Sequence, residues 1–338
     1  MYIVSSYAFA VVLCFITMIC WGSWGNTQKL AAKSWRYELF YWDYTIGMVL
    51  FSLLLAFTLG STGAEGRPFL QDICQADMSS LGWILIGAVV FNVSNILLSA
   101  SISIAGMSVA FPLGVGLALV MGVLNNIIFH PKGTENIPLL FLGVALVVVA
   151  IVCNGIASGK VSNDTRDASQ NRKGIILALL AGVIMSFFAT LVYNGVDLDN
   201  FQSPAVGKCT PYTAIVVFSI GVFLSQFVLG TIIMKKPFVG TPVSYGQYFR
   251  DGNAKTHIVG MLGGAIWCLG TALSYISAGK AGAAVSYALG QGAPLIAALW
   301  GVFVWKEFRG ANRSVNCLLG LMFGCFLLGL GLIIVAGM

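Results

Sequence analysis

The sequence predicts an all-α integral membrane protein with ten transmembrane helices, arranged as two inverted five-helix repeats. Three observations predict this fold class: hydrophobic residues make up 58% of the 338 residues, charged residues make up only 9%, and apolar stretches of spanning length recur along the whole chain. An average soluble domain has about 25% charged residues. The mean hydropathy of +0.90 therefore indicates that lipid is the solvent for most of this chain.

Ten stretches are long and apolar enough to cross a bilayer, because a spanning helix needs about 20 largely apolar residues. They lie at roughly 3–24, 40–59, 81–103, 107–128, 138–158, 174–194, 212–234, 257–277, 282–304 and 314–336. The first has no basic segment before it and no clear cleavage site after it, so it is interpreted as a span rather than a signal peptide. The polar segment 159–173 lies midway. It separates a first five-helix repeat (1–158) from a second (174–338) and is expected to be a cytoplasmic linker.

The distribution of basic residues predicts the orientation. Fourteen of the 18 Lys and Arg residues lie in the predicted loops at one end of the bundle. Loops rich in Lys and Arg stay in the cytoplasm. We therefore expect a multi-pass protein of the inner (plasma) membrane with both termini on the extracytoplasmic side.

The two halves resemble each other in sequence. The segment Gly87–Gly106 matches Gly260–Gly279 without gaps, and the motif LGVG at Leu113–Gly116 parallels LGQG at Leu289–Gly292. Two copies of a five-span unit must have opposite orientations, and such inverted repeats place a transporter's substrate site near the bilayer midplane. The alternative is that spans rich in Gly, Ala and Ser look alike by composition alone.

Several function classes lack their sequence signals. The phosphate-binding motif GxxxxGK[ST] is absent. His130 and His257 are the only histidines, and both fall at span ends, where a solvated position is the simpler interpretation. Because no acid, base and nucleophile converge, we expect neither an enzyme nor a metal site. Basic residues confined to short loops also argue against nucleic-acid binding. Cys74 and Cys209 lie in predicted loops at one end, so a disulfide between them stays open.

One carboxylate lies inside an apolar run. The stretch YELFYWDY (Tyr37–Tyr44) leads into the second span, and Asp43 lies about 10 Å beyond Arg36 along a helix. Acids inside spans are rare and are functional candidates. Removal from water favours the protonated form, so Asp43 is the candidate for proton coupling. The alternative is a structural acid that accepts hydrogen bonds from a Tyr or Trp of a neighbouring helix. Glu38 is expected near the headgroups, paired with Lys33 or Arg36.

Neutral polar side chains inside the spans are candidate solute ligands. Carboxamides offer donors and acceptors without charge, which suits a neutral polar solute; the candidates inside spans are Asn92, Asn95, Asn125 and Gln291, with Asn126 next to Asn125. Asn92 and Asn95 are expected on one helix face. The alternative for each carboxamide is a hydrogen bond between helices. Pro112 and Pro294 fall inside the fourth and ninth spans, where interrupted helices would point to a binding site.

Aromatic residues away from the span ends are the other candidate ligands. Trp21, Trp24, Trp267 and Tyr287 lie deep in the spans or beside polar groups, where they can stack on a ring-shaped solute. Simple core packing is the alternative for each of them. The proximity of these aromatics to carboxamides is typical of a site for a sugar or for a flat heterocycle.

Three segments resemble a known family. They are CWGSWGNTQKL (Cys20–Leu30), WRYELFYWDYTIG (Trp35–Gly47) and GMSVAFPLGVGLALVMGVLNN (Gly106–Asn126). They are similar to the ureide permease and the glucose/ribose/rhamnose porter branches of the drug/metabolite transporter superfamily. The resemblance implies alternating-access uptake of sugars or ureides, commonly coupled to protons. The matched positions are Trp21, Trp24, Glu38, Tyr41, Trp42, Asp43 and Gly47.

The sequence thus predicts a secondary active transporter that imports a small neutral polar metabolite, with a pentose or hexose sugar favoured. Uptake of a ureide or nucleobase is the alternative, as is export of a metabolite or drug. We expect no cofactor beyond a coupling proton or Na⁺, no catalytic residue, and a monomer or homodimer in the bilayer.

Overall fold

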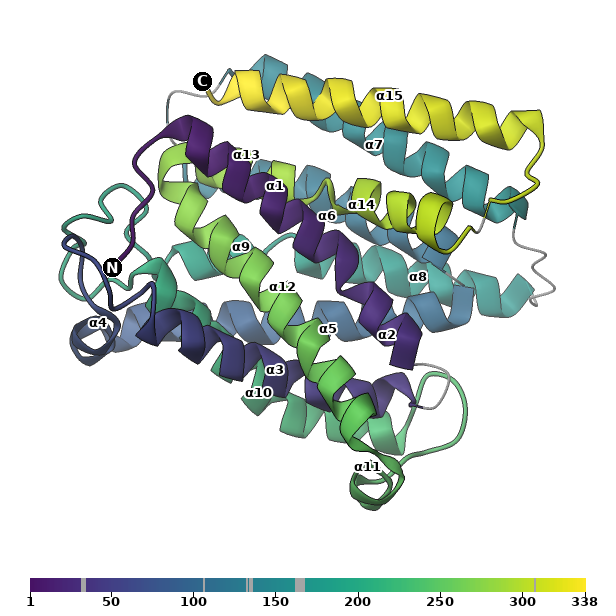
Figure 1. The fold of residues 1–338 in the computed structure, drawn as a ribbon, viewed down its shortest axis with the longest axis horizontal. Helices are drawn as coiled ribbons and strands as arrows, with labels where there is room; N and C mark the ends of the chain where they lie inside the picture. Colours follow the sequence, from purple (N-terminus) through teal and green to yellow (C-terminus); the bar gives the residue numbers. More distant parts are fainter. Residues whose placement is uncertain (32–34, 106, 132, 134–135, 162–167, 307) are drawn as a thin grey trace.

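The computed structural model describes residues 1–338 except 32–34, 106, 132, 134–135, 162–167 and 307. The described residues form helices joined by loops and contain no β-strand (Figure 1). The helices are α1 (Tyr7–Ser23), α2 (Gly25–Ala31), α3 (Tyr37–Phe57), α4 (Phe69–Gln75), α5 (Met78–Ala105), α6 (Met107–Phe129), α7 (Ile137–Val161), α8 (Ala168–Met185), α9 (Phe188–Tyr193), α10 (Pro211–Lys235), α11 (Tyr245–Asp251), α12 (Ala254–Ala281), α13 (Ala283–Gly290), α14 (Ala293–Leu299), the π-helix η1 (Trp300–Val304) and α15 (Arg313–Ala336).

Nine of the described helical stretches are long and apolar enough to cross a membrane. A shorter apolar stretch, Leu113–Phe129 within α6, coincides with the remaining predicted span. The prediction of an all-α membrane protein is confirmed. Its short helices α4 and α11 lie outside the spans, in the loops that follow α3 and α10.

Local sequence signals explain where several helices begin. Ser6 accepts a hydrogen bond from the backbone of Phe9 at the start of α1. Asn253 and Thr256 exchange side-chain-to-backbone hydrogen bonds at the start of α12. Such caps satisfy backbone N–H groups that a helix leaves unpaired in its first turn.

Three spans consist of consecutive helices with a break between them. The first span breaks at Trp24, between α1 and α2, and the sixth breaks at 186–187, between α8 and α9. The ninth breaks at 291–292, just before Pro294 in the first turn of α14, as the sequence indicated. The break expected at Pro112 is wrong, because α6 is continuous there. Pro112 is the sixth residue of α6, and the hydrogen bond that it removes would have joined it to the first turn of the helix.

The helices that pack together form matched pairs between the two halves. The second span (α3) lies against the eighth (α12), just as the seventh (α10) lies against the third (α5). The first span α1 likewise contacts α12, as the sixth span α8 contacts α5. The first helix of each half also breaks after a similar length, 17 residues in α1 and 18 in α8. This pattern supports the inverted repeat, which stays a prediction, as do the boundaries at 158 and 174.

The two ends of the bundle differ (Figure 1). The terminal end holds both chain termini, α4 and the loop between α9 and α10, whereas the basic end holds α11 and the first turns of α3 and α12. An even number of spans requires both termini to lie at the same end of the bundle. Which end faces the cytoplasm stays a prediction.

Candidate functional site

Two predicted tryptophans face each other, one in the last turn of α1 and one at the middle of α12. The rings of Trp21 (α1) and Trp267 (α12) are nearly parallel, with an interplanar angle of 14° and centroids 6.3 Å apart. Trp267 also contacts Phe91, at 4.4 Å between centroids. Trp267 is at the midpoint of the 28-residue α12, so the pair lies about halfway along this span.

Tyrosines extend this indole pair toward α3. The ring of Tyr44 lies 5.1 Å from Trp24 and 6.4 Å from Trp267, and it stacks on Tyr41 at 5.2 Å. Asn95 donates a hydrogen bond of 2.8 Å to the Tyr41 hydroxyl. The Tyr44 hydroxyl is fully buried and has no hydrogen-bond partner among the described residues. A buried hydroxyl without a partner costs about 1–3 kcal/mol, so it is a place where a solute can gain affinity.

We call these residues the indole–tyrosine cluster. Its members are Trp21, Trp24, Tyr41, Tyr44, Asn95 and Trp267. Five were predicted from the sequence. Tyr44 was missed, although it ends the aromatic stretch that the sequence had drawn attention to. None of its members is charged, which suits a neutral solute.

Asn92 does not join this cluster. Its side-chain nitrogen donates to the carbonyl oxygen of Val222 at 3.2 Å and to the hydroxyl of Ser225 at 2.9 Å, both on α10. Asn95, less than one turn away, turns toward α3 instead. The two carboxamides therefore bond to different neighbouring helices. Asn92 forms a hydrogen bond between α5 and α10.

Of the three remaining predicted residues, Gln291 lies at a helix break, Asn125 contacts one, and Tyr287 contacts α6. Asn125 donates to the carbonyl oxygen of Ser186, 3.2 Å away, between α8 and α9. Gln291 is buried at the break between α13 and α14. Tyr287 packs on Gly122 and donates to the carbonyl oxygen of Ala118 at 3.2 Å. These side chains support the interrupted helices beside the indole pair.

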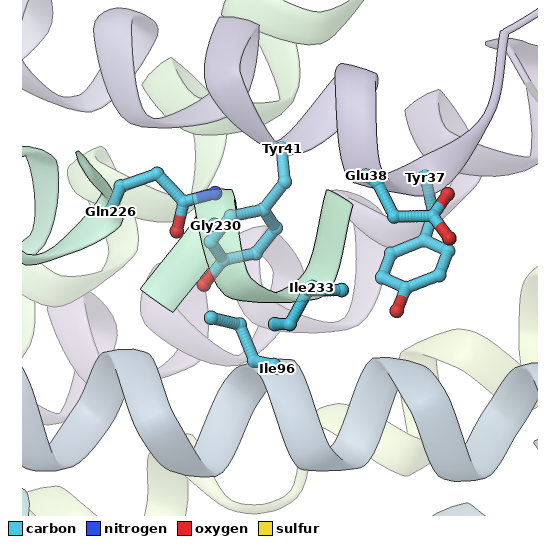
Figure 2. Close-up of a pocket in the computed structure, with 7 residues that line it drawn as sticks. All are labelled: Tyr37, Glu38, Tyr41, Ile96, Gln226, Gly230 and Ile233. Carbon is cyan, nitrogen blue, oxygen red and sulfur yellow. The ribbon is translucent and has the colours of Figure 1, made fainter. Parts of the chain in front are cut away.

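A small pocket lies between the indole–tyrosine cluster and the basic end (Figure 2). Tyr41 and Glu38 from α3, Gln226 from α10 and Ile96 from α5 are among its lining residues. Its volume of about 10 Å³ is near the ~10–15 Å³ needed for one water molecule. No solute fits there.

Glycines close the α3–α12 interface at this end. A Cβ on Gly264 would meet the backbone of Tyr44, a Cβ on Gly260 would meet the Asp43 side chain, and a Cβ on Gly47 would meet the backbone of Met261. The two helices therefore touch backbone to backbone. They leave no space for a solute between α3 and α12 at this end.

Asp43 is the centre of a buried hydrogen-bonded group at the basic end. Its side chain is 1% exposed and accepts hydrogen bonds from Trp35 Nε1 at 3.1 Å, from the Tyr248 hydroxyl at 2.5 Å and from His257 Nδ1 at 2.8 Å. The donors come from the loop before α3, from α11 and from α12. The expected structural contacts with a Tyr and a Trp are thus present, and a titratable partner is present as well.

The loop helix α11 covers this acid. Tyr248 reaches down from α11, and burial together with its hydrogen bond to Asp43 raises the pKa of its hydroxyl, so it stays a donor. Arg36, beside the group, pairs with Glu38 at 2.5 Å and donates to the carbonyl oxygens of Val239 and Thr241. The Arg36–Glu38 pair was expected. Glu38 is buried against its neighbours, at 3% exposed; its expected position at headgroup level stays a prediction, and Lys33 lies outside the described residues.

His257 is the residue that sequence reasoning misjudged. It was interpreted as a solvated histidine at a span end, but its side chain is only 24% exposed and it contacts Asp43 and Trp35. The two partners are far apart in sequence, so no local pattern joins them. The sequence did contain one signal for this contact: Asp43 and one of the two histidines fall at the same predicted end of the bundle.

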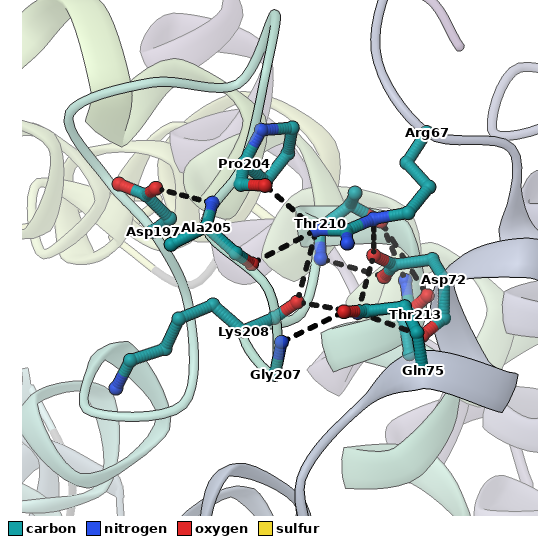
Figure 3. Close-up of polar contacts among 10 residues, drawn as sticks. All are labelled: Arg67, Asp72, Gln75, Asp197, Pro204, Ala205, Gly207, Lys208, Thr210 and Thr213. Atoms are coloured by element: carbon teal, nitrogen blue, oxygen red, sulfur yellow. Dashed lines mark hydrogen bonds and ion pairs between the residues drawn. The ribbon is translucent and has the colours of Figure 1, made fainter.

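A second charged group ties two loops together at the terminal end (Figure 3). Arg67 Nε lies 2.9 Å from the carboxylate of Asp72, which also accepts a 2.7 Å hydrogen bond from the backbone of Thr210 at the start of α10. Arg67 further donates to the carbonyl oxygens of Pro204 and Ala205, at 3.1 Å each. Each end of the bundle thus has a buried carboxylate that binds a loop of one half to a span of the other.

The cysteines in these loops are not bridged. Cys74 is exposed and Cys209 is buried, and both carry free thiols. Burial raises the pKa of Cys209 to about 12, so this thiol is unreactive at neutral pH. Among the described residues, no group of three or more His, Cys, Asp or Glu side chains could hold a metal ion.

Comparison with known proteins decides the family. The sequence model of the ureide permease family matches residues 40–173 and 168–336, which is most of the chain. The chain belongs to the ureide permease family. The resemblance read from the sequence is confirmed, and the protein is a membrane permease of a family of transporters rather than enzymes.

Individual relatives agree with this assignment. Ureide permease 1 of Arabidopsis thaliana is 22% identical over 94% of both chains, and the probable glucose uptake protein GlcU of Priestia megaterium is 26% identical over 70% of both. A solved crystal structure with 14% identity covers 96% of both chains with a TM-score of 0.60, which shows a shared fold.

Proposed function

We propose that this permease imports a small, neutral, ring-containing polar solute by alternating access, with Asp43 and His257 coupling uptake to protons. The observation that carries the proposal is the uncharged indole–tyrosine cluster at mid-membrane, with its unpartnered Tyr44 hydroxyl. Aromatic faces stack on a planar ring, and hydroxyl and carboxamide groups match its polar edges.

A ureide or a related heterocycle is our first candidate for the solute. The ureide permease family model covers both halves of the chain, and the parallel indoles of Trp21 and Trp267 suit a flat ring. A sugar, favoured by the sequence alone, is the second candidate. The similarity to a probable glucose uptake protein favours it, because pyranose rings also stack on indoles.

Proton coupling is proposed from the contacts of Asp43. The ionised carboxylate accepts three hydrogen bonds that hold α11 and α12 against α3. Protonation removes the charge that strengthens these bonds. The basic end would then loosen where α3 and α12 now touch. Binding and release of a proton at Asp43 would thereby set which end of the permease opens.

We further propose that the permease works in the plasma membrane with its basic end in the cytoplasm, from the asymmetry of Lys and Arg. Import rather than export follows from the uptake role printed for the sugar-related relative.

The test is uptake by purified protein in liposomes. Radiolabelled allantoin, uracil, ribose, glucose and rhamnose are each supplied with an imposed proton gradient, then with an uncoupler. We expect concentrative uptake of at least one heterocycle, abolished by the uncoupler. Uptake that is unchanged by the uncoupler would refute proton coupling. Export, rather than uptake, of every transported solute would refute the import direction.

A further inference from the structure

A larger cavity lies at the terminal end, opposite Asp43. Its volume of about 160 Å³ is roughly ten times what one water molecule needs. The N-terminal segment, the loop with Glu65, the loop with residues 198–202 and the end of α12 all line it, so both halves contribute. Its polar side chains are Ser5, Glu65, Asp199, Asn200, Gln202 and Lys280. It is the size of a small ring with polar substituents.

Phe201 closes the floor of this cavity. It is 8% exposed, and its ring lies so close to Gly279 that a Cβ there would meet the Phe201 ring at 2.7 Å. The Phe201 ring therefore packs directly on the backbone of α12 at Gly279. An aromatic ring on a loop, pressed against a helix without a side chain, can swing away without unpacking that helix.

Beneath Phe201, α1 and α12 meet along polar side chains. Trp21 Nε1 donates to the Thr271 hydroxyl at 3.0 Å, and the Thr17 hydroxyl donates to the carbonyl oxygen of Gly270 at 2.9 Å. Nearer the cavity, Cys14 Sγ lies 3.3 Å from the Ser277 hydroxyl. We call this line of contacts the α1–α12 seam.

Further hydroxyls lie beside the seam. Ser286 of α13 lies 3.0 Å from the Ser277 hydroxyl and donates to the carbonyl oxygen of Ser274 at 3.0 Å. Tyr275, one turn below Gly279 on the same face of α12, has a buried hydroxyl without a partner among the described residues. Polar groups inside a membrane bundle are costly unless they are used, and these connect the cavity with Trp267.

The two halves of α12 therefore differ. Between Trp267 and the basic end, Gly260 and Gly264 close the helix against α3. Between Trp267 and the terminal end, hydroxyls line it up to the cavity floor at Gly279. This second route offers hydroxyl groups to a polar solute on its way to the indole pair.

We propose that the terminal-end cavity is a loading site for the neutral ring-containing solute, that the α1–α12 seam leads from it to Trp21 and Trp267, and that Phe201 is the gate between them. This inference rests on the proposed function, because it needs a solute that is used at the indole pair. Asn200 and Gln202 supply the carboxamide groups that recognise a neutral polar ring.

The native thiol of Cys14 tests the route directly. A variant that keeps Cys14 and replaces the other seven cysteines by Ala is purified in detergent, where both ends are accessible. It is exposed to a charged methanethiosulfonate reagent, and modification is followed by mass spectrometry. Phe201→Ala should raise the modification rate by about tenfold, which corresponds to removing about 1.4 kcal/mol from the free energy of opening.

Two further variants keep this result interpretable. Phe201→Leu retains an apolar plug and should keep the modification rate low. Phe303→Ala removes an aromatic ring that is 66% exposed on η1, at the other end, and should change nothing. If Phe201→Ala leaves Cys14 as slowly modified as in the parent while the protein still transports, the gate is refuted and the proposed function stands.

The loading site is tested separately by transport kinetics. Gln202→Ala should raise KM severalfold with kcat unchanged, because it removes a contact made before the solute reaches the indole pair. Gln71→Ala, at an exposed position of α4 at the same end, is the matched control and should leave both constants unchanged. An unchanged KM in Gln202→Ala refutes the loading site. Absence of uptake by the parent protein refutes the proposed function instead.

Discussion

The Nδ1 atom of His257 lies 2.8 Å from the carboxylate of Asp43, although 214 residues separate them in sequence. Asp43 belongs to the second span and His257 to the eighth, so this contact joins the two halves of the permease. Both groups can change protonation state, and the cover helix α11 bonds to the same carboxylate. A proton that binds here acts on the interface that must open during transport.

Asp43→Asn should abolish coupling but keep solute binding. The carboxamide has nearly the same size, and its one oxygen can still accept the hydrogen bond of Tyr248, whereas its NH₂ group stands where Trp35 now donates. It cannot bind a proton. We expect loss of uptake driven by a proton gradient, while exchange of labelled for unlabelled solute across the liposome membrane continues.

The control for this variant is Asp251→Asn. Asp251 lies at the same end in an exposed ion pair with Arg250, with 46% of its side chain exposed, so its loss should leave uptake unchanged. Gradient-driven uptake by Asp43→Asn at the parent rate would show that the acid is structural.

His257→Gln should shift the pH profile of uptake rather than abolish uptake. Glutamine can donate a hydrogen bond to Asp43 in place of Nδ1, but it carries no charge at any pH. The profile of kcat/KM against pH, measured for parent and variant, should differ in shape, because the imidazole beside Asp43 has been replaced by an amide. Identical profiles would show that His257 takes no part in proton coupling.

Trp267→Phe should weaken solute binding moderately. An aromatic contact contributes about 0.5–1.5 kcal/mol beyond the area it buries, which corresponds to a ~2–10-fold rise in KM. Trp83→Phe is the matched control, because Trp83 is 40% exposed on α5. An equal KM for parent and Trp267→Phe would show that the indole pair does not bind the solute.

Composition and periodicity predicted the spans, because the requirement for about 20 apolar residues acts on each segment alone. Contacts between segments were not predictable in that way. Asp43 was identified because a lone acid in an apolar run is visible locally, whereas His257 became its partner only when α12 packed on α3. Asn92 and Asn95 were expected to act together, but the positions of α3 and α10 divide them.

The ion pair of Arg67 and Asp72 should stabilise the terminal end. Their side chains are 17% and 0% exposed, so loss of one partner leaves a buried charge uncompensated. Arg67→Met should therefore cost about 3–5 kcal/mol of unfolding free energy. The double variant Arg67→Met/Asp72→Leu should recover part of this loss, because no unpaired charge remains.

Thermal unfolding in detergent measures the two single variants, Arg67→Met and Asp72→Leu, and the double variant. Lys236→Met is a control, since Lys236 is an exposed basic residue at the opposite end. A double variant that is destabilised by the sum of the two single changes would show that Arg67 and Asp72 do not act as a pair.

His130 should make the terminal end sensitive to acid. Burial lowers the pKa of this imidazole, with a further lowering by Lys208 that a hydrogen bond to the Thr190 carbonyl and the charge of Asp199 oppose. Because its pKa in the folded state is below that in the unfolded state, the neutral form stabilises the fold. This stability is complete above the unfolded pKa of about 6.5 and is lost as the pH falls through the folded pKa. The melting temperature should therefore fall less between about pH 7.5 and about pH 5 in His130→Gln than in the parent. Equal falls in the two proteins would show that another group carries the acid sensitivity.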